Sequence, residues 1–151
     1  MEVSSRAFGN GETIPKEFTA DGRNVSPPLR WSGAPPATQS YAVIVDDPDA
    51  PAGLWTHWVL FNIPADRFEL PEAVPPENEV LDGALQGTNS FNKIGYGGPS
   101  PPKGKPHRYF FHVYALDRKL DLKAGASRAE VDAALKGHIL AKGQWMGTYG
   151  R

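Results

Sequence analysis

A short apolar run predicts a strand that is buried on both faces. Residues 41–45 read Tyr-Ala-Val-Ile-Val, and the run ends at Asp46-Asp-Pro-Asp-Ala-Pro51. Continuous apolar stretches of this length, rich in β-branched side chains and bounded by turn residues, are typical of central strands. We therefore expect residues 41–45 to lie in the middle of a sheet.

Two longer segments show the two-residue period of a strand. They are residues 55–62 and 107–116, in which successive side chains are expected to point to opposite faces. The first segment is predicted to place on one face Trp55, His57, Val59 and Phe61. The second is predicted to place on one face His107, Tyr109, Phe111 and Val113, and on the other Arg108, Phe110, His112 and Tyr114.

One helix is predicted near the C-terminus. Ser127 and Glu130 have capping-box spacing, in which hydroxyl and carboxylate each accept from a backbone N–H of the first turn. Gly143 is the predicted C-terminal stop, and the aromatic residues of segment 144–149 favour a short returning strand. The stripe at helical spacing consists of Val131, Leu135, His138 and Ile139.

Proline and glycine indicate a mostly β chain with long loops. The 151 residues include 15 prolines and 16 glycines, and such a content predicts many turns and few long helices. Only short edge strands fit the first forty residues, such as one at 29–31, while residues 64–82 are expected to form an irregular excursion and residues 95–104 a loop of fixed shape. The length suits a single domain, residues 1–151.

Charge and composition narrow the classes of partner. With 16 basic and 17 acidic residues the net charge is −1, so no global field attracts nucleic acid or an anionic membrane. The absence of cysteine excludes disulfides and thiolate sites. Residues 1–10 lack the pattern of a signal peptide, and no apolar run approaches the ~18 residues of a membrane span. We expect no transmembrane segment and a cytoplasmic location.

Acidic and imidazole side chains occur in three short motifs. Pro48 holds Asp47 extended, so Asp47 and Asp49 project in a fixed relation from a strand end, although an ordinary turn is equally consistent with this segment. His57 lies within an apolar strand, where a hydrogen-bonded core histidine is the competing interpretation. His107 begins a strand after a rigid loop, so its ring and that of Tyr109 are expected about 6.6 Å apart on one face.

The pair formed by His107 and Tyr109 suits an anion. Two donors at this spacing can bind different oxygens of one phosphate or carboxylate. A loop-edge histidine exposed to water is the alternative, and in both cases we expect His107 to contribute little to the core. The other two histidines, His112 and His138, are assigned to packing.

Two nearby features are weaker candidates. Lys103, Lys105 and Arg108 form a small basic cluster that can attract an anion or simply be solvated. Ser100 is not expected to be a nucleophile, because Gly98-Pro-Ser-Pro-Pro102 departs from the G-x-S-x-G pattern at its last position.

Together these motifs resemble the phosphatidylethanolamine-binding family, also called Raf-kinase-inhibitor-like proteins, and in particular its short prokaryotic branch. The resemblance covers almost the whole chain, from segment 26–31 to segment 147–149. It implies a sandwich of antiparallel sheets with a shallow anion pocket open to solvent. Its motifs are Asp47-Pro-Asp-Ala-Pro51, Trp55-Thr-His-Trp-Val59, and Gly95-Tyr-Gly-Gly-Pro-Ser-Pro-Pro102 followed by His107-Arg-Tyr109. Carried over by motif, the ligand-binding residues would be Asp47, Asp49, His57, Gly98, Pro102, His107 and Tyr109, with Trp55 as a wall.

The expected function is non-enzymatic binding. Imidazole, phenol and backbone N–H groups supply donors for phosphate oxygens, while the carboxylates can receive an ammonium or orient the imidazoles. We expect a small anionic ligand, phosphate or a phosphoethanolamine head group, with no cofactor and no metal. The resemblance also implies a protein target, either a kinase or a peptidase. The sequence is consistent with both a monomer and a homodimer. The alternative is a metal-dependent phosphoesterase or lyase that uses His57, His107, Asp47 and Asp49.

Overall fold

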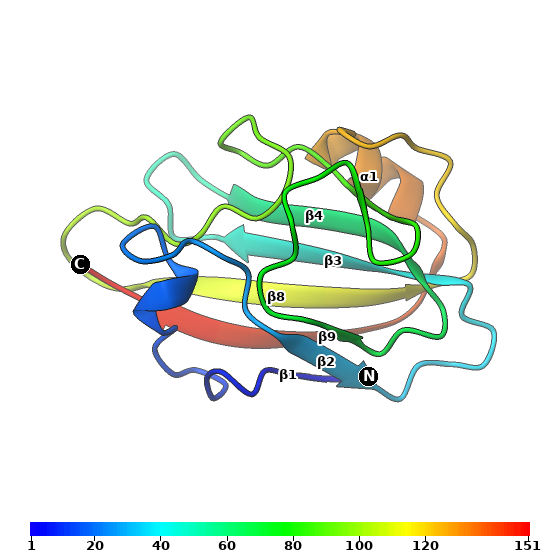
Figure 1. Ribbon diagram of the computed structural model, residues 1–151, viewed down its shortest axis with the longest axis horizontal. Helices are drawn as coiled ribbons and strands as arrows, with labels where there is room; N and C mark the ends of the chain where they lie inside the picture. Colours follow the sequence, from blue (N-terminus) through cyan, green and yellow to red (C-terminus); the bar gives the residue numbers. More distant parts are fainter.

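The computed structural model describes residues 1–151 as two antiparallel sheets with one α-helix. The larger sheet has the strand order β6-β7-β4-β3-β8-β9, and the smaller has the order β1-β2-β5. Figure 1 shows β4, β3, β8 and β9 side by side, with β1 and β2 near β9. The mostly β antiparallel fold expected from the sequence is confirmed. The elements are β1 Glu2–Ser4, the 3-10 helix η1 Lys16–Phe18, β2 Leu29–Ser32, β3 Ser40–Asp47, β4 Trp55–Pro64, β5 Glu69–Leu70, β6 Glu79–Val80, β7 Ala84–Gln86, β8 His107–Leu116, α1 Arg128–Leu135 and β9 Ile139–Tyr149.

The central strand β3 separates two apolar clusters. Every residue of β3 is buried. Tyr41, Val43 and Val45 belong to a main cluster of 21 buried residues, to which both sheets contribute. Ala42 and Ile44 face a second cluster of 9 buried residues that includes Val131 and Leu135 of α1. The prediction of a central strand buried on both faces is therefore confirmed.

The face prediction for β4 is wrong at Trp55 and His57. Val45 pairs with Trp58 but Asp46 pairs with Thr56, so a β-bulge inserts His57 as an extra residue. The His57 ring lies 5.2 Å from that of Tyr109, which belongs to the main cluster. Val59 and Phe61 instead face the second cluster. Strict alternation had placed Trp55 and His57 with these two residues, but the bulge puts both on the other side of the sheet, where their rings contact Phe91.

The C-terminal helix is shorter than predicted, and the strand after it is longer. The capping box at Ser127 and Glu130 is present, but α1 ends at Leu135 and Gly137 has a positive φ of 82°. His138 and Ile139 therefore lie outside the helix, and His138 contacts Asp117 near the surface instead of packing in the core. Strand β9 then runs for 11 residues.

Gly143 is not a helix stop. It lies within β9, opposite Val113 of β8. A Cβ atom at Gly143 would lie 2.7 Å from the carbonyl oxygen of Met1. Its role is therefore to let the N-terminal segment approach the sheet closely.

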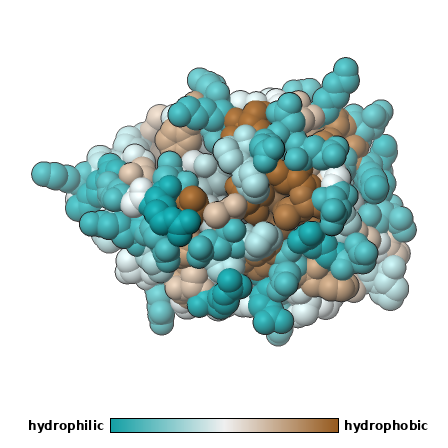
Figure 2. All heavy atoms as spheres, in the orientation of Figure 1, coloured by the Kyte–Doolittle hydropathy of each residue, from teal (hydrophilic) through white to brown (hydrophobic).

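The excursion between β4 and β7 covers the core. Val74 is buried in the main cluster. The buried side chain of Gln86 holds the excursion against the sheet, because it donates hydrogen bonds to Pro75 O at 2.7 Å and to Glu77 O at 2.8 Å. Trp58 Nε1 donates to Gln86 Oε1 at 2.7 Å. Figure 2 shows apolar side chains gathered right of centre, where Figure 1 shows the green loop segments, within a mostly polar face.

None of the helices has the length and apolar character that crossing a membrane requires. The cytoplasmic location expected from the sequence stays a prediction.

Candidate functional site

A cavity of about 230 Å³ opens where β3 ends and where β4 and β8 begin. Polar side chains from all three strands line it, together with apolar residues from the loops around its mouth. Six of the eight predicted ligand-binding residues meet here: Asp47, Trp55, His57, Pro102, His107 and Tyr109. The lining is completed by Ala50, Pro51, Ala52, Phe91, Ser100 and Pro101. We call this cavity the histidine pocket.

Asp49 is not part of the lining. Its carboxylate accepts two hydrogen bonds from the Arg108 guanidinium and one from Arg108 N, each 2.9 Å long. These hydrogen bonds, mainly those from the side chain, lower the pKa of Asp49 to about 2. Asp49 therefore ties the loop after β3 to β8, outside the histidine pocket.

Gly98 lies outside the lining of the histidine pocket and packs against the segment near η1. Its N–H donates to Asn24 Oδ1 at 2.8 Å, and a Cβ atom at this position would lie 2.7 Å from Phe18 O. Gly98 lines a neighbouring cavity rather than the histidine pocket. A glycine is required because the loop packs directly on the backbone near η1.

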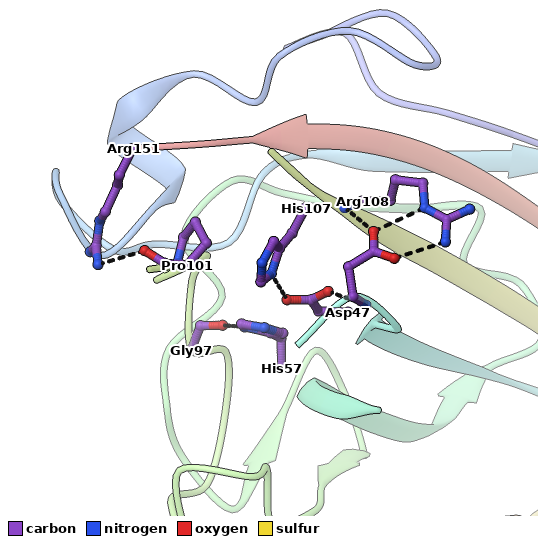
Figure 3. A network of polar contacts seen from close by, with 8 residues as sticks. Asp47, His57, Gly97, Pro101, His107, Arg108 and Arg151 are labelled. Carbon is purple, nitrogen blue, oxygen red and sulfur yellow. Dashed lines mark hydrogen bonds and ion pairs between the residues drawn. The ribbon is translucent and has the colours of Figure 1, made fainter. Parts of the chain in front are cut away.

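His107 forms a buried hydrogen bond with Asp47. His107 Nδ1 donates to Asp47 Oδ2 at 2.7 Å, across 60 residues of sequence, and Asp47 Oδ1 accepts from Asp49 N at 2.8 Å. Both side chains are buried, so the alternative of a loop-edge histidine exposed to water is wrong. The burial also argues against the expectation that His107 contributes little to the core. The Nδ1 contact leaves Nε2 as the only ring nitrogen without a protein partner (Figure 3).

His57 is held in the same manner by the backbone. Its Nδ1 lies 2.6 Å from the carbonyl oxygen of Gly97, and a carbonyl can only accept, so Nδ1 carries the proton. Burial lowers the pKa of His57 below its ordinary value, against raising effects from Gly97 and Asp47. At neutral pH the ring is therefore neutral, with an unprotonated Nε2.

Tyr109 completes the polar floor. Its ring lies 6.5 Å from that of His107, which agrees with the spacing predicted along one strand face. Burial, with the nearby charge of Asp47 as a second cause, raises the pKa of Tyr109 above its ordinary value, so the phenol stays protonated and can donate. The hydroxyls of Tyr96 and Tyr149 have protein acceptors, whereas that of Tyr109 has none.

The unpartnered polar atoms of the floor reach the cavity. Trp31 Nε1 is the one fully buried side-chain polar atom without a hydrogen-bond partner. The unpartnered Nε2 atoms of His57 and His107 and the Tyr109 hydroxyl are therefore open to solvent, and all three residues line the histidine pocket. These three groups converge from β4 and β8 on one small volume.

An ion pair behind the pocket was missed by the sequence. Arg128, the first residue of α1, pairs with the buried Asp46 and donates to Thr56 Oγ1 at 3.0 Å. Asp46 and Thr56 face each other across β3 and β4, next to Asp47 and His57. The ion pair spans 82 residues, and neither the capping motif nor the Asp-Pro motif signals it.

A second arginine holds the outer loop. Arg151 Nη1 donates to Pro101 O at 3.0 Å, and its other guanidinium nitrogens contact Asp21 at 2.8 Å and 3.0 Å. The hydrogen bonds from Arg151 and Tyr149 lower the pKa of Asp21 to about 2. Figure 3 shows this contact on the opposite side of Pro101 from His107.

The metal-dependent alternative has no supporting arrangement of ligands. No group of three or more His, Cys, Asp or Glu side chains is placed to hold a metal ion. Asp49, one of the four residues that this alternative needs, is engaged by Arg108.

The hydrogen bond between Asp47 and His107 makes a prediction about stability. His107→Ala removes the buried partner of a buried carboxylate, so we expect a loss of about 1–3 kcal/mol in the free energy of unfolding. The double variant with Asp47→Ala is expected to lose less than the two single variants added together, because the stranded charge is gone. His138→Ala, which breaks the exposed contact with Asp117, is the control and should cost much less. Denaturant unfolding measures the four variants and the wild type, and an unchanged stability of His107→Ala would contradict this role for the hydrogen bond.

Comparison with known proteins agrees with the motifs. The family model for phosphatidylethanolamine-binding protein matches residues 4–150. A UPF0098 protein of Methanothermobacter thermautotrophicus is 49% identical over 100% of this chain and 99% of its own length, and one of Aquifex aeolicus is 50% identical over 100% and 89%.

Two crystal structures share the fold. One is of a phosphatidylethanolamine-binding protein homologue from Chlamydia trachomatis, with a TM-score of 0.91, 37% identity and coverage of 99% of this chain and 97% of that one. The other is of Escherichia coli YbcL, described as a new member of the mammalian family, with a TM-score of 0.93, 38% identity and coverage of 99% and 98%. This chain therefore belongs to the phosphatidylethanolamine-binding protein family.

Proposed function

We propose that this chain is a non-enzymatic binding protein whose histidine pocket takes the phosphate-type group of a small anionic ligand. The proposal is supported by one observation above the others. His57 and His107 each have Nδ1 fixed by an acceptor of the protein, and each leaves Nε2 free in the same cavity as the Tyr109 hydroxyl. The Tyr109 hydroxyl can donate to one oxygen of a tetrahedral anion. Each imidazole Nε2 can accept from a protonated phosphate oxygen or, once protonated itself, donate to a further oxygen.

The phosphate, more than an amine, is the group that this floor suits. Asp47 is the only carboxylate in the lining. Its two oxygens already accept from His107 Nδ1 and Asp49 N. Of the two roles that the sequence left open for the aspartates, orienting an imidazole is therefore better supported than receiving the ammonium of a phosphoethanolamine head group.

Binding is favoured over catalysis by the absence of an activated nucleophile. Ser100 is the only aliphatic hydroxyl in the lining, and the hydrogen bonds of the two imidazoles go to Gly97 and Asp47 instead. A serine nucleophile needs a base within hydrogen-bond reach. A kinase or peptidase target and the choice between monomer and homodimer stay predictions.

The Tyr109 hydroxyl provides a direct test of the proposed function. Tyr109→Phe removes one oxygen from a side chain that is otherwise packed in the core, so we expect stability to stay nearly constant. Affinity for inorganic phosphate should fall by about tenfold or more, since a hydrogen bond to a charged group is lost. Tyr114→Phe, on the opposite face of β8, is the matched control. Calorimetric titration measures both, and an equal affinity of Tyr109→Phe and wild type would remove the phenol from the site.

The lowered pKa of His57 predicts how binding depends on pH. Neutral His57 presents a lone pair at Nε2, whereas protonated His57 presents a second donor. Because its pKa lies below the ordinary value of about 6.5, this donor appears only on acidification, and affinity should rise as pH falls through that range. We expect a non-titrating sulfate ester to bind more tightly at about pH 5.5 than at about pH 8.5. His57→Asn should flatten the profile, and equal or tighter binding at the higher pH would contradict a charged histidine contact.

A further inference from the structure

The segment that supplies half of the residues lining the histidine pocket is positively charged. Residues 83–116 contain no aspartate or glutamate, but they include Lys93, Lys103, Lys105 and Arg108. The whole chain has a net charge of −1, so the basic character is local. Such a local excess raises the concentration of anions near the cavity.

Acidic groups near the pocket do not cancel this charge. Each of these carboxylates has a polar contact with a basic side chain: Asp47 with His107, Asp49 with Arg108, and Asp21 with Arg151. None of the ion pairs in the structure includes Lys93, Lys103 or Lys105. The acids are thus paired and the three lysines are free for a ligand.

A second cavity adjoins the histidine pocket. It measures about 200 Å³ and shares Phe91 and Ser100 with the pocket's lining. Among its polar residues, Tyr96 and Asn89 are engaged, because the Tyr96 hydroxyl donates to Phe18 O and Asn89 donates to Gly95 O. Its unengaged polar groups are the ammonium of Lys93, the amide NH₂ of Asn24 and the hydroxyl of Ser100. These are mainly donors, so they favour an acceptor or an anion.

Lys93 and Phe91 are presented by a fixed loop. The buried Asn89 accepts from Phe91 N at 2.9 Å and from Lys93 N at 3.2 Å. Its own N–H donates to Lys93 O at 2.9 Å. The loop is therefore held in place without a ligand, which lowers the entropy lost on binding.

Phe91 forms the partition between the two cavities. Its ring contacts the rings of Trp55 and His57 edge-on, each with centroids 5.5 Å apart. Behind it, a Cβ atom at Gly97 would lie 2.6 Å from Phe91 Cδ2, so the ring rests directly on backbone. A ligand that occupies both cavities has to cross the edge of this ring, beside Ser100.

We propose that the histidine pocket and the second cavity form one bipartite site, which binds a phosphate ester whose chain ends in a second anionic group. The phosphate lies against His57, His107 and Tyr109, the chain crosses Phe91, and the terminal anion pairs with Lys93. This inference rests on the proposed function of the pocket and adds the class of ligand.

The test uses pairs of phosphate esters of equal length. Alkyl phosphates from ethyl to pentyl are each compared, by calorimetric titration, with the same chain ending in a carboxylate. At the length that spans Phe91, the carboxylate form should bind about three- to tenfold more tightly to the wild type. Lys93→Gln should make the two affinities equal, and Lys93→Glu should reverse the preference. Lys119→Gln changes net charge equally outside both cavities and should keep the preference.

The possible results separate the two proposals. If none of the phosphates binds the wild type, the proposed function fails. If alkyl phosphates bind but no chain length shows a preference for the carboxylate, the bipartite site is contradicted while the histidine pocket stands. A preference that survives in Lys93→Gln also contradicts it, because the second anion would then be bound elsewhere.

Discussion

The fixing of Nδ1 in two imidazoles is the constraint on which the site depends. The Asp47 carboxylate holds one ring and the Gly97 carbonyl holds the other. A histidine ring has only two nitrogens, so an acceptor at Nδ1 decides which nitrogen faces the cavity and which tautomer the neutral ring adopts. The protein thereby fixes the orientation of each ring, one on β4 and one on β8. It leaves free the Nε2 atoms, which are the ones that would contact a ligand. Pre-organised groups of this kind bind with a smaller loss of entropy.

A strand end and a β-bulge place the Asp47 and His57 side chains at the pocket. Asp47 is the last residue of β3, and His57 reaches the pocket only because a bulge inserts it opposite the junction of Val45 and Asp46. Bulges re-aim single side chains in this way. On the other side of the sheet, Arg128 bonds Asp46 and Thr56, so α1 secures the strand ends next to both pocket residues. The contacts of α1 on one face of the larger sheet therefore stabilise the strand ends that carry the pocket residues on the other face.

Local patterns predicted the elements well and their contacts less well. Strand β8 was predicted with its observed bounds, because its alternation is regular and its loop is rich in glycine and proline. The capping box fixed the start of α1, but the apolar stripe continued into β9, so His138 and Ile139 were assigned to the helix. Periodicity reports which residues are apolar, and it does not report where a backbone turns from helix to strand.

The candidate site shows the same division. Motifs identified Asp47, His57, His107 and Tyr109, yet they assigned Asp49 to the pocket because nothing in the Asp-Pro-Asp pattern shows that Arg108 engages its carboxylate. The pairing of Arg128 with Asp46 and the hydrogen bond from Arg151 to Pro101 join segments far apart in sequence. Such pairings follow from the register of strands and the path of loops, which a single sequence does not encode in any local pattern.

Proton–nitrogen NMR correlation spectra of the histidine side chains report directly which nitrogen of each imidazole carries the proton. At neutral pH, the account predicts that His57 and His107 are protonated at Nδ1. Addition of sulfate at about pH 5.5, where Nε2 becomes a donor, should shift the Nε2 resonances of these two residues and leave those of His112 and His138 in place. A neutral His57 protonated at Nε2, or Nε2 resonances of His57 and His107 that sulfate does not shift, would contradict the account.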